Sequence, residues 1–259
     1  MDFKNKIAVV TGGGRGLGSD VGLALAKLGA TVVLSGRTAK SLDEAKDAIE
    51  AIGGKASVYV GDMADAESVN RFASEVFDKY GRVDVLVNNA AIGGPSAPLW
   101  EVAVDDWKET LNINTTGPFL TSRAFLPSMI EKKSGSIVFV GSMTGKRELL
   151  NRTAYAASKI ALVGLVRTLA WEVGPYGIRV NMVSPGPMEG ARMKWVLEKQ
   201  AENENITIDA ARARLTSRSP VGRFVSTQDV VNAILFLASD DASSTTGEDL
   251  NVSSGICMY

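Results

Sequence analysis

The sequence predicts an α/β protein built on one doubly wound, parallel β-sheet with helices on both faces. Short runs of β-branched residues alternate with longer segments in which apolar residues recur at helical spacing. The strand-like runs are apolar on both faces, which is typical of a parallel sheet that helices cover on each side. No linker rich in Pro, Ser or charge interrupts the alternation, and no internal repeat is present. We therefore expect residues 1–259 to form a single domain.

Seven strands follow from the β-branched runs, and together they make a seven-stranded sheet. They are expected at Ile7–Thr11, Thr31–Ser35, Ala56–Val60, Val83–Asn88, Ser136–Gly141, Arg179–Ser184 and Asp249–Val252. The segments between the strands predict helices at Gly16–Leu28, Ser41–Ile52, Ala66–Tyr80, Asp105–Lys132, Tyr155–Tyr176 and Gln228–Ala238. Glycine follows three of these patterns, at Gly29, Gly53 and Gly81, because it readily adopts the left-handed conformation that ends many helices.

One stretch departs from this alternation. Gly186–Val225 is polar and irregular, with helical pieces at Arg192–Ala201 and Asp209–Thr216. It is inserted before the last strand, at the edge where parallel sheets bind ligands. The segment at about 187–225 is therefore expected to be a lid over a site.

The composition limits the possible environments. Apolar residues make up 45% and charged residues 22%, which suffices for a large core. A formal charge of −1 gives no reason to expect nucleic acid or an anionic membrane as a partner. Cys257 is the only cysteine, so no internal disulfide can form, and a free thiol fits a reducing compartment. The first residues contain no long apolar stretch, so a cytoplasmic location is expected.

The absence of histidine restricts the chemistry further. The chain has none, so Ser-His-Asp hydrolysis and imidazole-bearing metal sites are excluded, and no metal site is expected. Proton transfer must use Tyr, Lys, Asp, Glu or Cys. A hydrolase is also disfavoured because no Gly-x-Ser-x-Gly segment is present.

A glycine-rich segment, Thr11-Gly-Gly-Gly-Arg-Gly-Leu-Gly18, joins the first strand to the first helix. Glycines let the backbone turn tightly and approach a pyrophosphate, whose charge the N–H groups of the helix start would meet. A tight turn without a ligand is the alternative, and the motif alone is weak. The lysine of a nucleotide-triphosphatase loop is missing after Gly18, which argues against phosphate hydrolysis. The expected cofactor contacts here are Gly12, Gly14, Arg15, Gly16, Leu17 and Gly18.

The end of the second strand favours NADP(H), with NAD(H) as the second choice. An acid at this point would bind the ribose 2′-hydroxyl of NAD, but the chain has Gly36 followed by Arg37. Arg37 can pair with a 2′-phosphate, and Arg15 can reach the same place. A solvated surface arginine is the alternative for Arg37. Asp62 can accept a hydrogen bond from an adenine amino group, or it can cap the next helix.

Tyr155 and Lys159 are four residues apart, so on a helix they share one side. An ammonium near a phenol stabilises the phenolate, so the tyrosine can act as an acid or base near neutral pH. Ser142 follows the fifth strand at the ligand-binding edge, where its hydroxyl could hold a substrate oxygen.

These motifs, together with Asn88-Asn89-Ala90, Asn114 and Pro185-Gly186, stand in an order and spacing that resembles the short-chain dehydrogenase/reductase family over the whole chain. The resemblance implies a Rossmann-type fold and an oxidoreductase that transfers a hydride between NADP(H) and an alcohol/ketone pair. Tyr155 would be the general acid/base, Ser142 would orient the substrate oxygen, Lys159 would bind the nicotinamide ribose, and Asn114 would hold a water in a proton relay. Further cofactor contacts are implied at Asp62, Met63, Asn89, Ala90, Tyr155, Lys159, Pro185, Gly186 and Met188.

Two positions depart from the family pattern. Ala91 stands where the family usually has glycine, a small change. Gly190 stands where the family commonly has a threonine that bonds the nicotinamide carboxamide, so backbone groups would have to replace that contact. Asn88 has a structural alternative, since buried amides often only hold strands together.

The pocket is expected between Ile92–Trp100, Met143–Thr153 and the segment from Met188 onward. Lys146, Arg147 and Arg152 lie in its walls, so the small-molecule substrate could be anionic, although charged loop residues are usually only solvated. A 3-oxoacyl-carrier-protein reductase and a non-enzymatic NAD(P) sensor are the alternative functions. Excess apolar residues on the Tyr155–Tyr176 helix, together with the family resemblance, predict a homotetramer, with a dimer as the fallback.

Overall fold

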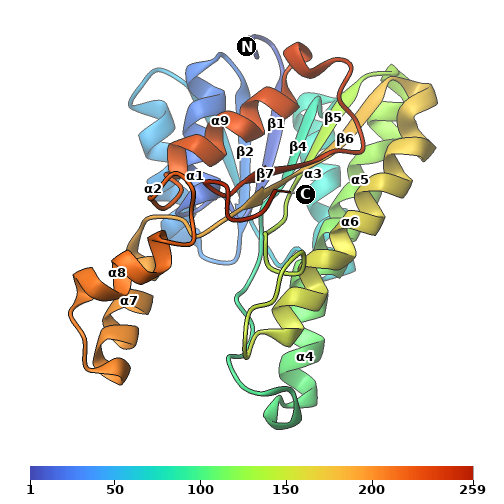
Figure 1. Ribbon diagram of the computed structural model, residues 1–259. Coiled ribbons are helices and arrows are strands. Elements are labelled where there is room, and N and C mark those ends of the chain that lie inside the picture. The colour runs from blue at the N-terminus through green and yellow to red at the C-terminus, as the bar shows by residue number, and fades with distance from the viewer. Residues whose placement is uncertain (259) are drawn as a thin grey trace.

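A seven-stranded parallel sheet forms the centre of the molecule (Figure 1). The computed structural model describes residues 1–258, apart from the side chains of residues 191, 192, 195, 199, 200 and 203. Within this part, the strand order is β3-β2-β1-β4-β5-β6-β7, so the chain reverses direction across the sheet between β1 and β4. The strands are β1 (Ile7–Thr11), β2 (Thr31–Gly36), β3 (Lys55–Val60), β4 (Val85–Asn88), β5 (Gly135–Val140), β6 (Ile178–Pro185) and β7 (Asp249–Val252). The predicted fold class is confirmed.

Helices cover both faces of the sheet. One face packs against α1 (Leu17–Lys27), α2 (Ala39–Glu50) and α9 (Thr227–Ala238). The other packs against α3 (Ala66–Tyr80), α5 (Gly117–Lys132) and α6 (Thr153–Val173). Neighbouring strand residues point to opposite faces, so in β1 the side chains of Ala8 and Val10 enter the first core and that of Val9 enters the second. This double burial explains why the strands are apolar throughout.

The helix predicted at Asp105–Lys132 is interrupted. The chain forms α4 (Val104–Leu111), a π-helical turn (Asn112–Thr116) and then α5. Within this turn, the Asn114 side chain accepts a hydrogen bond from the Ile92 N–H at 2.8 Å and donates to the Ile92 carbonyl at 3.0 Å. Such widened turns cluster at functional sites. The apolar spacing continues through the turn, so periodicity alone cannot reveal it.

The segment between β6 and α9 stands away from the sheet (Figure 1). It contains α7 (Ala191–Glu204) and α8 (Ile208–Thr216), which share a small core around Leu197, Ala211 and Phe224. Its two ends are joined at the base, where the Val225 N–H donates to the Pro187 carbonyl and the Glu189 N–H donates to the Val225 carbonyl, both at 2.9 Å.

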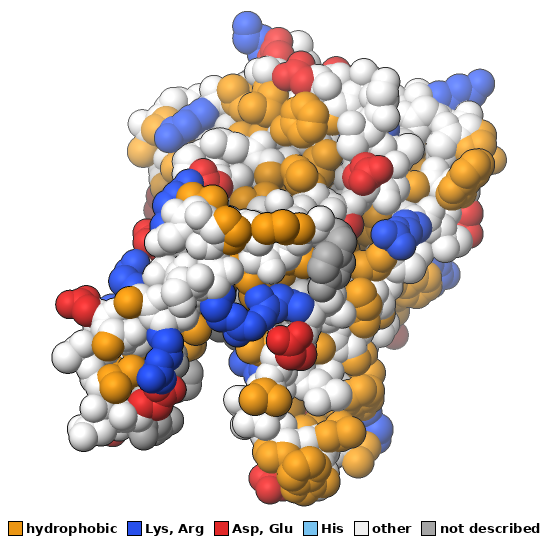
Figure 2. Space-filling model, in the orientation of Figure 1, with side chains coloured by type: hydrophobic (Ala, Val, Ile, Leu, Met, Phe, Trp, Pro, Cys, Tyr) orange, Lys and Arg blue, Asp and Glu red, His pale blue; other side chains and the backbone are white. Residues whose placement is uncertain are grey.

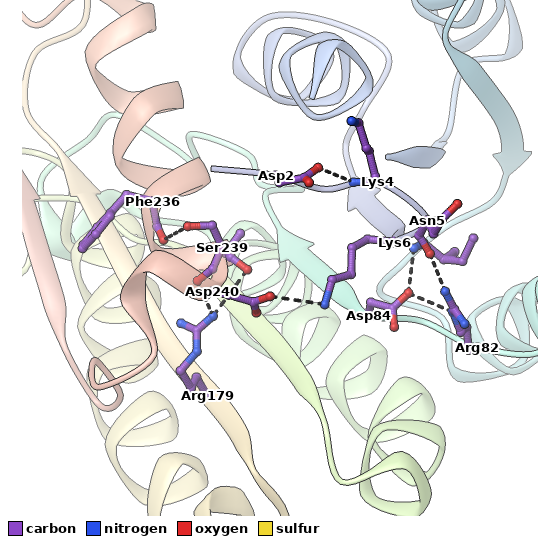
Figure 3. A network of polar contacts seen from close by, with 12 residues as sticks. Asp2, Lys4, Asn5, Lys6, Arg82, Asp84, Arg179, Phe236, Ser239 and Asp240 are labelled. Atoms are coloured by element: carbon purple, nitrogen blue, oxygen red, sulfur yellow. Dashed lines mark hydrogen bonds and ion pairs between the residues drawn. The ribbon is translucent and has the colours of Figure 1, made fainter. Parts of the chain in front are cut away.

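Polar contacts tie the amino ends of the strands together (Figure 3). Asp84 Oδ2 accepts from the Ile7 N–H at 2.8 Å and from Arg82 Nε at 3.0 Å. Arg179 donates to the Leu237 carbonyl at 2.6 Å and to the Ser239 carbonyl at 2.8 Å, at the carboxyl end of α9. Among all helices of the described residues, none has the length and apolar character needed to cross a bilayer.

Candidate active site

Ser142 lies at the carboxyl end of β5, where two main-chain hydrogen bonds fix the loop that carries it. The Gly141 N–H donates to the Val183 carbonyl at 2.8 Å, and the Met143 N–H donates to the Pro185 carbonyl at 3.1 Å. The Ser142 hydroxyl oxygen accepts from the Thr144 N–H at 3.0 Å. The side chain is therefore held at the edge where parallel sheets bind ligands.

Lys159 lies one turn after Tyr155 on α6 and is 4% exposed. Its Nζ donates to the Val140 carbonyl at 2.8 Å and lies 5.9 Å from the centre of the Tyr155 ring. Burial removes water from the ammonium and lowers the pKa of Lys159 to about 8. Near neutral pH the lysine is still cationic, and a cation at this place favours the phenolate form of Tyr155.

Arg152 lies directly before α6 and is a second cation near the same ring. Its guanidinium carbon is 5.3 Å from the centre of the Tyr155 ring, and Nη2 donates to the carbonyl of Gly93 in the loop after β4. The Tyr155 ring therefore has two cations near it.

Lys146 and Arg147 have acidic partners. Lys146 Nζ lies 2.5 Å from Asp249 Oδ2 and donates to Asn251 Oδ1 at 2.5 Å, with both members of the ion pair more than nine-tenths buried. This contact joins the loop after β5 to β7. Arg147 Nη2 lies 3.5 Å from Glu148 Oε1. Lys146, which the sequence suggests as a contact for an anionic substrate, is therefore part of an internal ion pair. A buried carboxylate such as that of Asp249 is strongly destabilising unless a cation lies beside it.

Asn114 is a fully buried residue of the π-helical turn. Besides its contacts with Ile92, its Nδ2 donates to the Ser158 hydroxyl at 3.0 Å, and that hydroxyl donates to the Tyr155 carbonyl at 2.8 Å. Ser158 thus links Asn114 to the first turn of α6. The sequence analysis missed Ser158, although its position three residues after Tyr155 puts it on a neighbouring helix face.

The glycine-rich turn has the shape of a dinucleotide cradle. Gly12 has φ of +64°, and a Cβ on Gly18 would lie 2.2 Å from the Gly12 carbonyl oxygen, so neither position accepts a side chain. Asn89 Nδ2 donates to the carbonyls of Thr11 and Gly12 at 2.9 and 3.1 Å, which holds the turn against β4. Helix α1 begins after Gly16 without a side-chain cap, so its first N–H groups suit a phosphate. These residues fit a bound nicotinamide dinucleotide.

The other predicted cofactor residues surround this cradle. Arg15 and Arg37 are exposed, and Gly36 ends β2. Asp62 accepts from the Ala64 N–H at 2.9 Å in a turn before α3, whereas the N-cap of α3 is Asp65. Met63 is buried just after Asp62. The Ala90 N–H donates to Thr11 Oγ1 at 3.1 Å, which holds the loop after β4 against the end of β1. Asn88 bonds Ser122 and Thr121 of α5, as the structural alternative expected.

The loop after β6 explains one departure from the family pattern. Gly186 donates to the Val252 carbonyl at 2.8 Å, and Met188 is paired with Val225. Gly190, just before α7, has φ of +138°. Side chains rarely adopt this conformation, so a threonine at this position would be strained. Glycine here is a consequence of the path that the backbone takes into α7.

Comparison with known proteins gives consistent matches along the whole chain. A family model described as enoyl-(acyl carrier protein) reductase matches residues 12–257. A 3-oxoacyl-[acyl-carrier-protein] reductase of Thermotoga maritima is 36% identical over 258 residues, with 100% of each chain covered. The crystal structure of an NAD⁺-bound xylitol dehydrogenase is 32% identical, with a TM-score of 0.92, 98% of this chain and 100% of that chain covered. A variant of actinorhodin polyketide ketoreductase with NADPH is 30% identical, with a TM-score of 0.92 and 98% of each chain covered.

Proposed function

The chain belongs to the short-chain dehydrogenase/reductase family, and from that premise we propose that it passes a hydride between NADP(H) and an alcohol/ketone pair, with Tyr155 as the acid/base. Membership makes it an NAD(P)-dependent oxidoreductase that acts on CH–OH and C=O groups. The assignment of roles to its own residues rests chiefly on the Tyr155 ring, which has the Lys159 ammonium 5.9 Å from its centre.

In this proposal each residue has a separate task. The Ser142 hydroxyl and the Tyr155 hydroxyl hold the substrate oxygen, and Tyr155 gives it a proton during reduction or removes one during oxidation. The cationic Lys159 favours the phenolate that forms in the reductive direction. Bound nicotinamide supplies or accepts the hydride. Asn114 has both amide hydrogens engaged with Ile92 and Ser158, so a relay water would bond its Oδ1 or a main-chain carbonyl of the π-helical turn.

The test is hydride transfer itself, measured as a change in nicotinamide absorbance. Polyols, hydroxy acids and ketones would be screened with both NADP(H) and NAD(H), in both directions. We expect at least one alcohol/ketone pair to give turnover that depends on the cofactor. Cofactor binding without turnover of any pair would instead support a sensor on the same fold.

NADP(H) is the proposed cofactor. The end of β2 carries Gly36 and then Arg37 where an NAD-binding protein has an acid, and Arg15 of the glycine-rich turn is exposed as well. Direct titration should show tighter binding of NADPH than of NADH. Arg37→Ala should reduce that preference by roughly 10- to 100-fold, since a charge-assisted contact to the 2′-phosphate is lost. Arg71→Ala, on the exposed side of α3, is the control and should leave the preference unchanged. Equal affinities in the unmodified protein would overturn the assignment.

Reduction of a 3-oxoacyl group on a carrier protein is the second candidate. The observation that favours it is 36% identity over the full length of a 3-oxoacyl-[acyl-carrier-protein] reductase. A 3-oxoacyl carrier protein and a small 3-oxoacyl thioester would therefore be included in the screen. Turnover of the carrier-bound substrate well above that of small ketones would favour this function.

The segment at 187–225 is proposed to be a lid over the site.

A homotetramer is proposed as the assembly. Two exposed side chains support it: Trp171 on α6 is 87% exposed, and Phe119 on α5 is 47% exposed. Aromatic side chains are enriched at protein–protein interfaces, and closed symmetric assembly is the commonest arrangement of oligomers. Light scattering should give four times the mass of the chain, and Trp171→Asp should lower that mass. A stable, fully active monomer would contradict the proposal.

A further inference from the structure

A buried ion pair joins the loop that carries Ser142 to the last strand of the sheet. Lys146 Nζ lies 2.5 Å from Asp249 Oδ2, and the two side chains are 9% and 8% exposed. Figure 2 shows that other Lys and Arg side chains stay on the surface, in the recess between the α7–α8 segment and the part of the molecule that carries α4. Lys146 is instead withdrawn from solvent, although desolvation of its ammonium opposes this placement. A buried pair often adds little to stability compared with apolar residues, so this one calls for a second role.

The loop after β5 is anchored to two neighbouring strands. The first anchor is on β6, where the Met143 N–H donates to the Pro185 carbonyl at 3.1 Å. The second anchor is on β7, where Lys146 Nζ meets Asp249 and also donates to Asn251 Oδ1 at 2.5 Å. Between the anchors the chain makes a turn, in which the Lys146 N–H donates to the Met143 carbonyl at 3.1 Å. The ion pair therefore fixes the far end of this turn.

The Ser142 hydroxyl depends on the same turn for its orientation. Its oxygen accepts from the Thr144 N–H at 3.0 Å, and Thr144 lies between the two anchors. A serine hydroxyl has a single hydrogen, and an oxygen that accepts from the loop can direct this hydrogen away from the loop. In the proposed function that hydrogen faces the substrate oxygen. A shift of the turn would therefore shift the group that holds the reacting oxygen.

We propose that Lys146 and Asp249 are positioning residues, which hold the turn after β5 so that the Ser142 hydroxyl meets the substrate oxygen. This inference deepens the proposed function and rests on it. Neither side chain touches the substrate, and both act through Ser142. An ion pair suits the task because opposite charges attract strongly where water is excluded. A displacement of about 1 Å near reacting atoms can lower a rate by about 100-fold, so the tether controls turnover even where it adds little stability.

The test replaces the pair with neutral side chains. The double substitution Lys146→Met/Asp249→Asn removes both charges together, so the unfolding temperature should stay close to that of the wild type. Turnover is followed as NADPH absorbance with ethyl 3-oxobutanoate and with each ketone of the screen above. We expect kcat to fall by roughly 10- to 100-fold, while KM changes less than about threefold and NADPH affinity stays within about twofold.

A second set of variants shows whether the pair acts through Ser142. Ser142→Ala removes the hydroxyl, so adding Lys146→Met/Asp249→Asn to it should lower kcat further by no more than about twofold. Amide hydrogen exchange of the peptide covering residues 141–147 should be faster in Lys146→Met/Asp249→Asn than in the wild type. The same two substitutions in an ion pair at the amino ends of the strands, Lys6→Met/Asp240→Asn, are the control and should change neither kcat nor the exchange of this peptide.

Asp249→Asn alone is the milder variant, since it keeps an oxygen beside Lys146 Nζ. It should show a smaller loss of kcat with the same dependence on Ser142. Unchanged kcat in Lys146→Met/Asp249→Asn would overturn the inference alone, and so would an equal loss with and without the Ser142 hydroxyl. Failure of the unmodified protein to reduce any carbonyl, with NADPH still bound, would instead overturn the proposed function and this inference with it.

Discussion

The two ends of the sheet differ in the surroundings of one buried charge. At the amino ends of the strands, charges are matched to one another and to helix carbonyls: Asp84 holds Arg82, Lys6 lies 3.6 Å from Asp240, and Arg179 binds the end of α9 (Figure 3). At the carboxyl ends, Lys146 is likewise paired with Asp249, but Lys159 donates to a main-chain carbonyl and lies near an aromatic ring. Among the described residues, the second arrangement leaves a buried ammonium without a carboxylate beside it.

The absence of a carboxylate beside Lys159 in the described structure is the feature that distinguishes it from the paired charges. Pairing satisfies a charge, whereas burial beside a neutral acceptor leaves it energetically strained and lowers the pKa of Lys159 to about 8. Groups whose pKa is displaced by burial are concentrated at functional sites. The comparison predicts that changes at the carboxyl end alter rates and pH dependence, and that changes at the amino end alter stability alone.

The largest effect is expected from Tyr155→Phe. The change keeps the ring and removes the proton, so turnover should fall by roughly 100- to 10,000-fold, as for other lost acid/base groups. Cofactor affinity and the unfolding temperature should stay nearly constant, since the ring still packs beside Lys159. Steady-state assays and NADPH titration measure both. Tyr176→Phe, in the exposed turn after α6, is the control and should keep full activity. Near-normal turnover of Tyr155→Phe would remove Tyr155 from the mechanism.

Much of this comparison could be anticipated from the sequence. The alternation of strands and helices follows from local periodicity, and the strands are apolar because both faces are buried. Tyr155 and Lys159 could be paired because residues four apart share a helix side. Ser142 could be placed at the ligand-binding edge because it directly follows a predicted strand, and ligands bind at the carboxyl ends of parallel strands. Each of these inferences needs only local spacing.

Contacts between distant segments could not be anticipated. Lys146 was predicted to face the pocket, but its partners Asp249 and Asn251 lie about a hundred residues later in the sequence, and nothing local indicates that pairing. The π-helical turn at Asn112–Thr116 depends on the contact of Asn114 with Ile92, which adds no apolar signal. The φ of Gly190 likewise depends on how the backbone enters α7.

A smaller effect concerns the pH dependence of stability at Lys159. The ordinary lysine pKa of 10.5 applies to the unfolded chain, and about 8 applies to the folded one. As pH falls from 10.5 toward 8, the unfolded chain takes up the proton first, so the folded state loses stability; below pH 8 both states are protonated and the loss is complete. Relative to Lys159→Met, the wild type should therefore lose about 3 kcal/mol over this range.

Denaturant unfolding of both proteins at several pH values between 7 and 10.5 measures this difference. Using the difference cancels every other titrating group, and it also cancels the constant effect of the Val140 carbonyl that the methionine leaves without its donor. A difference that does not vary with pH would show that Lys159 is hydrated in the folded protein, and the electrostatic contrast between the two ends of the sheet would then fail.

The smallest effect is expected at the amino end, from Arg179→Met. The guanidinium donates to the carbonyls of Leu237, Ala238 and Ser239, so it satisfies the carboxyl end of α9 and interacts favourably with the helix dipole. Burial lowers the pKa of Arg179 and the Asp240 carboxylate raises it, so the charge is partly desolvated. Methionine keeps the apolar stem but leaves these carbonyls without their donor.

In Arg179→Met the free energy of unfolding should fall by about 1–2 kcal/mol, while kcat/KM stays within twofold of the wild type. Arg71→Met, which removes an exposed pair with Glu67, should change stability by no more than about 0.5 kcal/mol. Thermal unfolding at one protein concentration and steady-state assays give both quantities. A clear loss of activity in Arg179→Met would show that the two ends of the sheet are coupled, and that stability and catalysis are not divided between them.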